Sequence, residues 1–265
     1  MAKRIFLPMF ILFTYWCQAQ DYYMPRNPAS SPKPQNYARF KDSIPAKRYF
    51  IALNLGISIP LGGFGEKDTN QYFMIPTNTD STHAKGFANV GFHINAKGGI
   101  FLSQNFGLLA KVGYSVNTFD ANSLNSIING YYYYSVSGNY SIWQVMGGAF
   151  IRLPISDATS FRAEGMLGGI YANYPTASVS NSLETISFKL SNASDFAYSL
   201  SIGIEQEIDD NFSFTGGITY TGAELNYPTA TYTYSGTVAG TYYQRYPVSM
   251  SYGSLDFSIG LIYHL

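Results

Sequence analysis

Ser254-Leu-Asp-Phe-Ser-Ile-Gly-Leu-Ile-Tyr-His-Leu265 is the stretch of sequence that decides the fold. Apolar residues occupy every second position from Leu255 to Leu265, and small or polar residues fill most of the gaps. Because successive side chains of a strand point to opposite faces, this pattern predicts a strand with one apolar face and one small or polar face. No later segment of the sequence can cover the apolar face, so we expect lipid to cover it.

The composition favours the same interpretation. Charged residues make up 12% of the sequence, whereas ordinary soluble domains contain about 25%. Lys and Arg number 16, Asp and Glu also number 16, and this balance provides no basic surface for nucleic acid. Beyond the first twenty residues no stretch has the length and apolarity of a transmembrane helix. A charge-poor, aromatic-rich chain without such helices is typical of a transmembrane β-barrel.

Residues 1–19 have the layout of a secretory signal peptide. A short basic start is followed by an apolar run from Ile5 to Trp16, and the small residue Ala19 precedes the expected cleavage site. A lipoprotein signal around Cys17 is a weaker alternative, since Trp16 stands where such a signal has a very small residue. Cys17 is the single cysteine, so the exported chain is expected to lack disulfides and thiolate ligands.

The rest of the sequence divides into an extension, residues 20–47, and a barrel, residues 48–265. The extension contains five prolines among polar and basic residues, which predicts a disordered periplasmic segment. From Tyr49 to Ile59 apolar residues occupy every second position, with Phe50, Ala52, Asn54, Gly56 and Ser58 between them, which predicts the first strand. Seven further strands are expected at about 86–102, 105–118, 139–154, 160–174, 194–208, 211–224 and 251–265.

The connections between these strands alternate in length. Short polar turns are expected at 103–105, 156–160 and 209–211, and long connections at 60–85, 119–138, 175–193 and 225–250. This alternation predicts an all-β, eight-stranded antiparallel up-and-down transmembrane β-barrel with short periplasmic turns and long extracellular loops.

Glycine pairs lie inside the predicted strands, at Gly98-Gly99, Gly147-Gly148, Gly168-Gly169 and Gly216-Gly217, where they relieve crowding in a small closed barrel. On the basis of these glycine pairs, the regular spacing of the hairpins and the terminal strand, the chain resembles the OmpA-like and opacity-type small outer-membrane β-barrels of Gram-negative bacteria. The resemblance covers about residues 48–265 and implies an outer-membrane location without a specific function. Members of that family often end on Phe, whereas this sequence ends on Leu265.

Eight charged residues are expected on the inward face, four of them basic and four acidic: Lys97, Lys111, Arg152, Arg162, Glu164, Glu205, Glu207 and Asp256. Buried charges are tolerated when they are paired, and eight strands enclose a lumen that side chains can fill. We therefore expect a closed, salt-bridged interior with a structural role. An ion or proton path through the same residues is the alternative.

Counting residues outward from the turn centres gives the expected partners of these charges. It sets Arg152 opposite Glu164, and it sets Lys97 opposite Lys111. A like-charged pair needs compensation from across the lumen, for which Glu205 and Asp256 are the candidates.

The histidines, His83, His93 and His264, give little support for catalysis. Some eight-stranded outer-membrane barrels are lipid A hydrolases or acyltransferases that use a His and a Ser. Here Asn95 stands two residues after His93, so the close His-x-Ser spacing is absent. The sequence has no metal-ligand spacing, phosphate-binding loop or nucleophile elbow. We expect no enzymatic activity, cofactor or metal, and a hydrogen-bonded His93 inside the lumen.

The long connections 119–138 and 225–250 are rich in Tyr, Thr and Ser. Tyr offers amphipathic contact area, so these segments are candidate surfaces for extracellular ligands, glycans or proteins. The same residue types also prolong hairpins above a membrane, which is the simpler explanation. The sequence thus predicts a monomeric outer-membrane barrel with a structural or surface-interaction role. The alternatives are a porin-like small-solute channel and a soluble, secreted lipocalin-like barrel with apolar faces inward.

Overall fold

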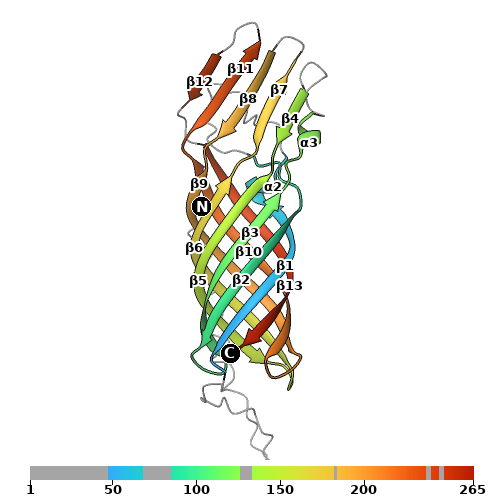
Figure 1. Ribbon diagram of the computed structural model, residues 1–265, viewed down its shortest axis with the longest axis vertical. Coiled ribbons are helices and arrows are strands. Elements are labelled where there is room, and N and C mark those ends of the chain that lie inside the picture. Colours follow the sequence, from blue (N-terminus) through green and yellow to red (C-terminus); the bar gives the residue numbers. More distant parts are fainter. Residues whose placement is uncertain (1–46, 68–84, 126–132, 182–183, 237–239, 245–247) are drawn as a thin grey trace, which may run out of the picture. The chain divides into compact units, whose positions relative to one another are not determined.

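The computed structural model describes residues 47–67, 85–125, 133–181, 184–236, 240–244 and 248–265. The predicted signal peptide, and all of the predicted extension except Lys47, lie outside the described residues. Eight strands close into an antiparallel barrel (Figure 1), which confirms the predicted fold class. They are β1 (Tyr49–Leu61), β2 (Gly91–Phe101), β3 (Phe106–Asn117), β5 (Tyr140–Pro154), β6 (Thr159–Asn173), β9 (Ala193–Glu207), β10 (Phe212–Tyr227) and β13 (Val248–His264).

The barrel is closed by pairing of its first and last strands. β1 and β13 are antiparallel from Phe50↔His264 to Leu61↔Gly253. The remaining neighbours follow the order of the chain around the ring. Every barrel strand therefore has a partner on both sides, and closure removes the unpaired edges that an open sheet exposes. No helix within the described ranges is long and apolar enough to cross a membrane.

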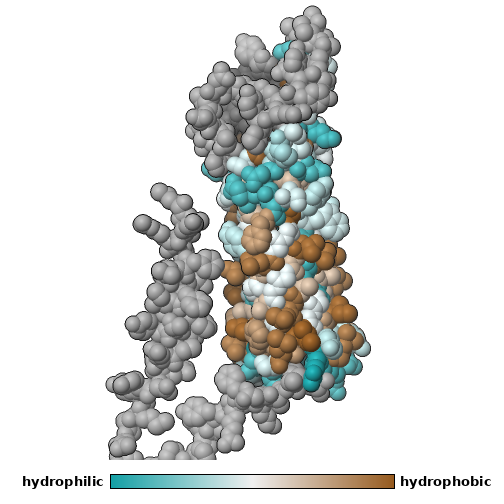
Figure 2. Space-filling view, turned by 90° about the vertical axis from the view of Figure 1, so that its left-hand side faces the viewer, coloured by the Kyte–Doolittle hydropathy of each residue, from teal (hydrophilic) through white to brown (hydrophobic). Residues whose placement is uncertain are grey.

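The two faces of the barrel wall differ as the alternation predicts, with the apolar face outward. On β1, Leu53, Leu55 and Ile57 are 54%, 46% and 49% exposed, whereas Asn54 and Ser58 are buried. Equivalent residues on the other strands form an apolar belt around the barrel (Figure 2). A soluble barrel of the lipocalin type requires the opposite arrangement, with apolar side chains inside.

The three short turns lie together at one end, which we call the turn end. Each contains a polar side chain that accepts a hydrogen bond from the backbone N–H three residues later. Ser103 Oγ accepts from Phe106 at 3.1 Å, Ser156 Oγ from Thr159 at 3.2 Å, and Asp209 Oδ1 from Phe212 at 2.8 Å. Such local bonds favour tight turns and explain the polar residues at these positions.

At the opposite end, the sheet end, the long connections are more ordered than predicted. They contain α2 (Gly62–Gly65), α3 (Ala121–Asn125) and five strands: β4 (Tyr133–Ser137), β7 (Thr176–Ser180), β8 (Glu184–Leu190), β11 (Ala230–Gly236) and β12 (Gly240–Gln244). The five strands form one open sheet in the order β12-β11-β8-β7-β4. Prolonged hairpins are the simpler explanation that the sequence offered for the connections rich in Tyr, Thr and Ser, and β11 and β12 form one. The pairing of strands from different connections into one sheet was not predicted.

The register corrects one predicted pairing. Arg152 lies opposite Arg162, and Glu164 lies opposite Phe150. The turn is centred on Asp157, one residue earlier than assumed, and each residue of error at a turn centre moves the partner by two positions. Lys97 lies opposite Lys111, as expected.

Candidate functional site

The barrel lumen contains the charged residues that the sequence singled out. Lys111, Arg162, Glu164, Glu205 and Asp256 are buried. The side chains of Lys97 and Arg152 are 13% and 20% exposed, and that of Glu207 is 43% exposed. Six of the eight barrel strands therefore contribute charged side chains to the lumen: β2, β3, β5, β6, β9 and β13.

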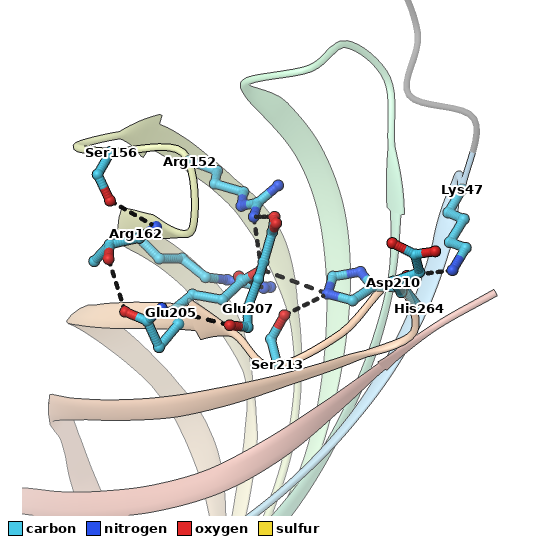
Figure 3. A network of polar contacts seen from close by, with 11 residues as sticks. Lys47, Arg152, Ser156, Arg162, Glu205, Glu207, Asp210, Ser213 and His264 are labelled. Atoms are coloured by element: carbon cyan, nitrogen blue, oxygen red, sulfur yellow. Dashed lines mark hydrogen bonds and ion pairs between the residues drawn. The ribbon is translucent and has the colours of Figure 1, made fainter.

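The cluster nearest the turn end is built around Glu205 (Figure 3). Arg152 Nη2 lies 3.2 Å from Glu205 Oε1 and 2.5 Å from Glu207 Oε1. His264 Nε2 lies 3.5 Å from Glu205 Oε1 and 3.0 Å from Ser213 Oγ. One fully buried carboxylate thus joins side chains from β5 and β13 at the mouth of the lumen, and His264 connects it to Ser213 of β10.

Deeper in the lumen, Arg162 is held by charge and by aromatic rings. Its Nε lies 2.9 Å from Glu164 Oε1, and its Nη1 lies 3.4 Å from Glu205 Oε2. The guanidinium carbon is 4.4 Å from the ring centroid of Phe50 and 4.3 Å from that of Phe150. A desolvated guanidinium gains from ring faces as well as from carboxylates. Arg162 therefore bridges two charged layers while it blocks the lumen between them.

Glycines on neighbouring strands make room for these rings. A Cβ at Gly99 would lie 2.4 Å from the Phe50 ring, and a Cβ at Gly107 would lie 2.5 Å from the Phe150 ring. Phe101 completes the layer, with its centroid 5.7 Å from that of Phe50 and 5.0 Å from that of Phe150. Glycine at positions 99 and 107 is therefore required for the rings of Phe50 and Phe150 to fill this cross-section of the barrel.

The two opposed lysines are compensated differently from the expectation. Lys97 Nζ lies 2.6 Å from Glu164 Oε2, so Glu164 is its partner. Glu205, which was expected to serve the lysines, belongs to the cluster of Arg152 and Arg162. Asp256, the other expected partner, lines the same enclosed cavity as Lys111, a cavity of about 10 Å³.

His93 also lines this cavity and is buried in the lumen, where the sequence placed it. Within the described part of the chain, His93 Nδ1 and Asp256 Oδ1 are buried atoms without a hydrogen-bond partner. The cavity volume is about that of one water molecule, which could satisfy both atoms. A neighbouring cavity between Lys97, Glu164 and Ser201 measures about 30 Å³. Neither cavity admits an organic substrate.

No metal-binding group can be assembled from the described residues, which contain no cluster of three or more His, Cys, Asp or Glu suited to an ion. His83 lies outside the described residues. His264 is engaged with Glu205 and Ser213 at the turn end. The described histidines are therefore members of the lumenal polar network.

The sheet end of the lumen is closed by a plug that the sequence did not predict. Phe64 of α2 is 0% exposed, and its ring centroid lies 4.9 Å from those of both Tyr140 and Tyr252. Tyr174 adds a fourth ring, 5.1 Å from Tyr140. The segment Gly62-Gly-Phe-Gly65 could have indicated the plug, because a large apolar residue flanked by glycines can enter a crowded space that bulkier neighbours would block.

Backbone hydrogen bonds hold the plug by joining the start and the end of the connection between β1 and β2. Gly86 N–H donates to Gly63 O at 2.7 Å, and Ala88 N–H donates to Phe64 O at 3.1 Å. A Cβ at Gly86 would lie 2.2 Å from Phe64 O, so only glycine permits this approach. Lys85 also forms an ion pair with Glu66.

A second ion pair, between Lys67 and Asp120, joins the plug to the segment before α3. Burial alone would raise the pKa of Asp120. Hydrogen bonds from Lys67 and from the N–H and hydroxyl of Ser123 outweigh this effect and lower the pKa of Asp120 to about 2. The carboxylate therefore stays charged and paired at neutral pH.

Comparison with known proteins gives structural matches alone. No family model and no curated protein matches the chain. Neisserial surface protein A has 10% identity and a TM-score of 0.46, over 82% of this chain and 97% of its own. A major outer membrane protein from Thermus thermophilus has 8% identity and a TM-score of 0.45, over 82% and 99%. Ail, the attachment invasion locus protein of Yersinia pestis, has 11% identity and a TM-score of 0.40, over 83% and 99%.

Proposed function

We propose that the protein is a monomeric, non-enzymatic β-barrel of the bacterial outer membrane, with a closed interior, that holds a five-stranded sheet outside the cell for surface interaction. The observation that carries this proposal is the inverted arrangement of the wall, with apolar side chains outward and paired charges inward. Water cannot favour an exposed belt of Leu, Ile, Val and Phe around a whole molecule, whereas the hydrocarbon core of a membrane does.

The borders of the belt support two membrane interfaces, and the turns support an orientation. Aromatic residues border it near the turn end, where the rings of Phe212 and Tyr263 lie 5.0 Å apart, and towards the sheet end, where those of Tyr198 and Tyr220 lie 6.0 Å apart. Such girdles occur at the two membrane interfaces. Short turns of outer-membrane barrels face the periplasm, which leaves the sheet end outside the cell.

Strand length supports a raised sheet. The barrel strands have 11 to 17 residues, whereas about 9–11 residues suffice to cross the membrane. Figure 2 shows a polar upper barrel above the belt, and Figure 1 shows the five-stranded sheet beyond the barrel, so the sheet is held away from the membrane surface. A sheet raised above the membrane in this way is accessible to extracellular molecules.

The closed interior distinguishes this proposal from a small-solute channel. Three obstacles follow one another along the lumen: the Arg152, Glu205 and His264 cluster, the Arg162 layer between phenylalanine rings, and the Phe64 plug. Two cavities among the described residues of the lumen, one beside Lys111 and one beside Arg162, measure only about 10 and 30 Å³. A solute path would need several of these contacts to open together.

Two measurements test the proposal. Purified protein reconstituted in planar bilayers should give little conductance, and large, stable current steps would overturn the closed interior. Recovery in carbonate-washed outer membranes with heat-modifiable gel migration is the expected fractionation result. A soluble periplasmic pool would instead contradict the membrane barrel.

A further inference from the structure

The five-stranded sheet has two unlike faces. On one face, Ala177, Phe188 and Leu190 are buried, at 0%, 2% and 2% exposure. Phe188 contacts Tyr174 at the barrel mouth, with 6.4 Å between ring centroids. This apolar face joins the core at the sheet end and therefore fixes the sheet in place.

The opposite face carries hydroxyl groups in register across the strands. The backbone pairings Ser135↔Ser178, Ser178↔Ser187 and Ser187↔Thr233 place four of them in one row across β4, β7, β8 and β11. Ser135 and Thr233 are exposed, and Ser178 and Ser187 are half-buried. The hydroxyls of Ser178 and Ser187 lie 3.0 Å apart, which sets them side by side on the surface.

A second row runs parallel to the first. It contains Ser180, Thr185 and Ser235, through the pairings Ser180↔Thr185 and Thr185↔Ser235. Tyr133 stands at the end of this row, opposite Ser180, and its side chain is 68% exposed. We call these two rows, with Tyr133, the hydroxyl face.

The grid has regular spacing because it is built on a sheet. Neighbouring strands lie about 4.8 Å apart, and alternate residues along one strand are about 6.6 Å apart. Lys189 is the single charged residue among the described positions on this side of the sheet. The hydroxyl face is thus a nearly neutral array of groups that both donate and accept hydrogen bonds.

This chemistry selects among partner classes. Nucleic acids and anionic head groups require several basic residues, which the face lacks. Protein partners require apolar or arginine anchors at the centre of the contact, and here the centre is Ser and Thr. A neutral sugar chain offers repeated hydroxyls for the grid and apolar ring faces for an exposed Tyr ring. We infer that the hydroxyl face binds a neutral polysaccharide, an inference that rests on the proposed extracellular position of the sheet.

The test uses the whole barrel in lipid nanodiscs and two neutral glucose hexamers, cellohexaose and maltohexaose, as probes. Ser187→Ala/Thr233→Val removes two hydroxyls from the grid while it keeps strand-compatible side chains. The matched control, Ser194→Ala/Thr118→Val, removes the same two hydroxyl types from exposed positions outside the five-stranded sheet. Binding is measured by saturation-transfer NMR and surface plasmon resonance, and a sulfated oligosaccharide of similar length serves as the charged comparison.

We expect wild-type protein and the control to bind at least one neutral hexamer, and the grid variant to bind it about tenfold more weakly or worse. Equal binding by the grid variant and the control would overturn the assignment to this face. Preference for the sulfated probe would overturn the neutral-ligand class. Absence of neutral hexamer binding by folded, non-conducting wild-type protein would overturn the inference and leave the proposed function standing. Large conductance or a soluble pool would instead contradict the proposed function itself.

Discussion

Replacing Glu164 by Gln should destabilise the barrel strongly, because Glu164 is the shared partner of the buried Arg162 and the largely buried Lys97. Its carboxylate side chain is 5% exposed and lies 2.6 Å from Lys97 Nζ and 2.9 Å from Arg162 Nε. Gln keeps the size of the side chain but removes the negative charge. Breaking a buried ion pair by removing one partner costs about 3–5 kcal/mol, because the remaining charge is buried without compensation.

Glu207→Gln provides a matched control in the same lumen. Glu207 also pairs with an arginine, at 2.5 Å from Arg152 Nη2, but its side chain is 43% exposed. Water can solvate Arg152 after the change, so the expected loss is below about 1 kcal/mol. The comparison separates burial from the presence of an ion pair.

The measurement is urea-induced unfolding of detergent-refolded protein, followed by tryptophan fluorescence and by heat-modifiable gel migration. Trp143 is the single Trp outside the predicted signal peptide, and it is 50% exposed on the outer surface, where it reports loss of the detergent environment. Equal, small losses for Glu164→Gln and Glu207→Gln would refute the reasoning. In the double variant Lys97→Met/Glu164→Gln, removal of one uncompensated cation should restore part of the lost stability.

Three further changes test the belt, the plug and its tether. Leu261→Arg places a charge in the belt at a position that is 53% exposed, so membrane assembly in vesicles should lose about 2–4 kcal/mol, whereas Ser194→Arg on the polar upper barrel should assemble normally. Phe64→Ala empties the plug and should lower the free energy of unfolding by about 3–5 kcal/mol, and an unchanged urea midpoint would contradict the packing argument. Asp120 has a folded-state pKa of about 2, below its ordinary value of about 3.9, so its contribution to stability is present above about pH 4 and is lost as the pH falls through about 2. An NMR titration of Asp120 with its midpoint near pH 4 would show that Lys67 does not hold it.

The barrel strands could be predicted because their signal is local. From Leu53 to Ile57 each apolar residue is followed by one that fits a crowded lumen, and only one face of the wall can meet lipid. The register of Lys97 and Lys111 also followed, because the turn at Ser103 was centred correctly. The predicted partner of Arg152 was wrong, because its turn is centred on Asp157, one residue earlier than the prediction assumed.

The partners of the lumenal charges and the structures at the sheet end could not be predicted from local sequence patterns. Glu164 reaches Lys97 across the lumen, so the pair depends on side-chain direction in three dimensions as well as on spacing along the chain. Phe64 enters the barrel mouth because of glycines and aromatic rings from four separate segments. The five-stranded sheet joins hairpins that lie far apart in sequence, and no periodicity within one hairpin indicates its neighbour.

The pairing of β1 with β13 governs how the barrel can fold. These strands lie at opposite ends of the described barrel sequence, so the seam is the contact with nearly the greatest loop-closure cost in the molecule. Until β13 arrives, β1 and β10 each present an unpaired edge that can template aggregation. We therefore expect closure to be late and rate-limiting in assembly, so that changes confined to the seam slow folding more than equally destabilising changes in the local hairpin of β2 and β3.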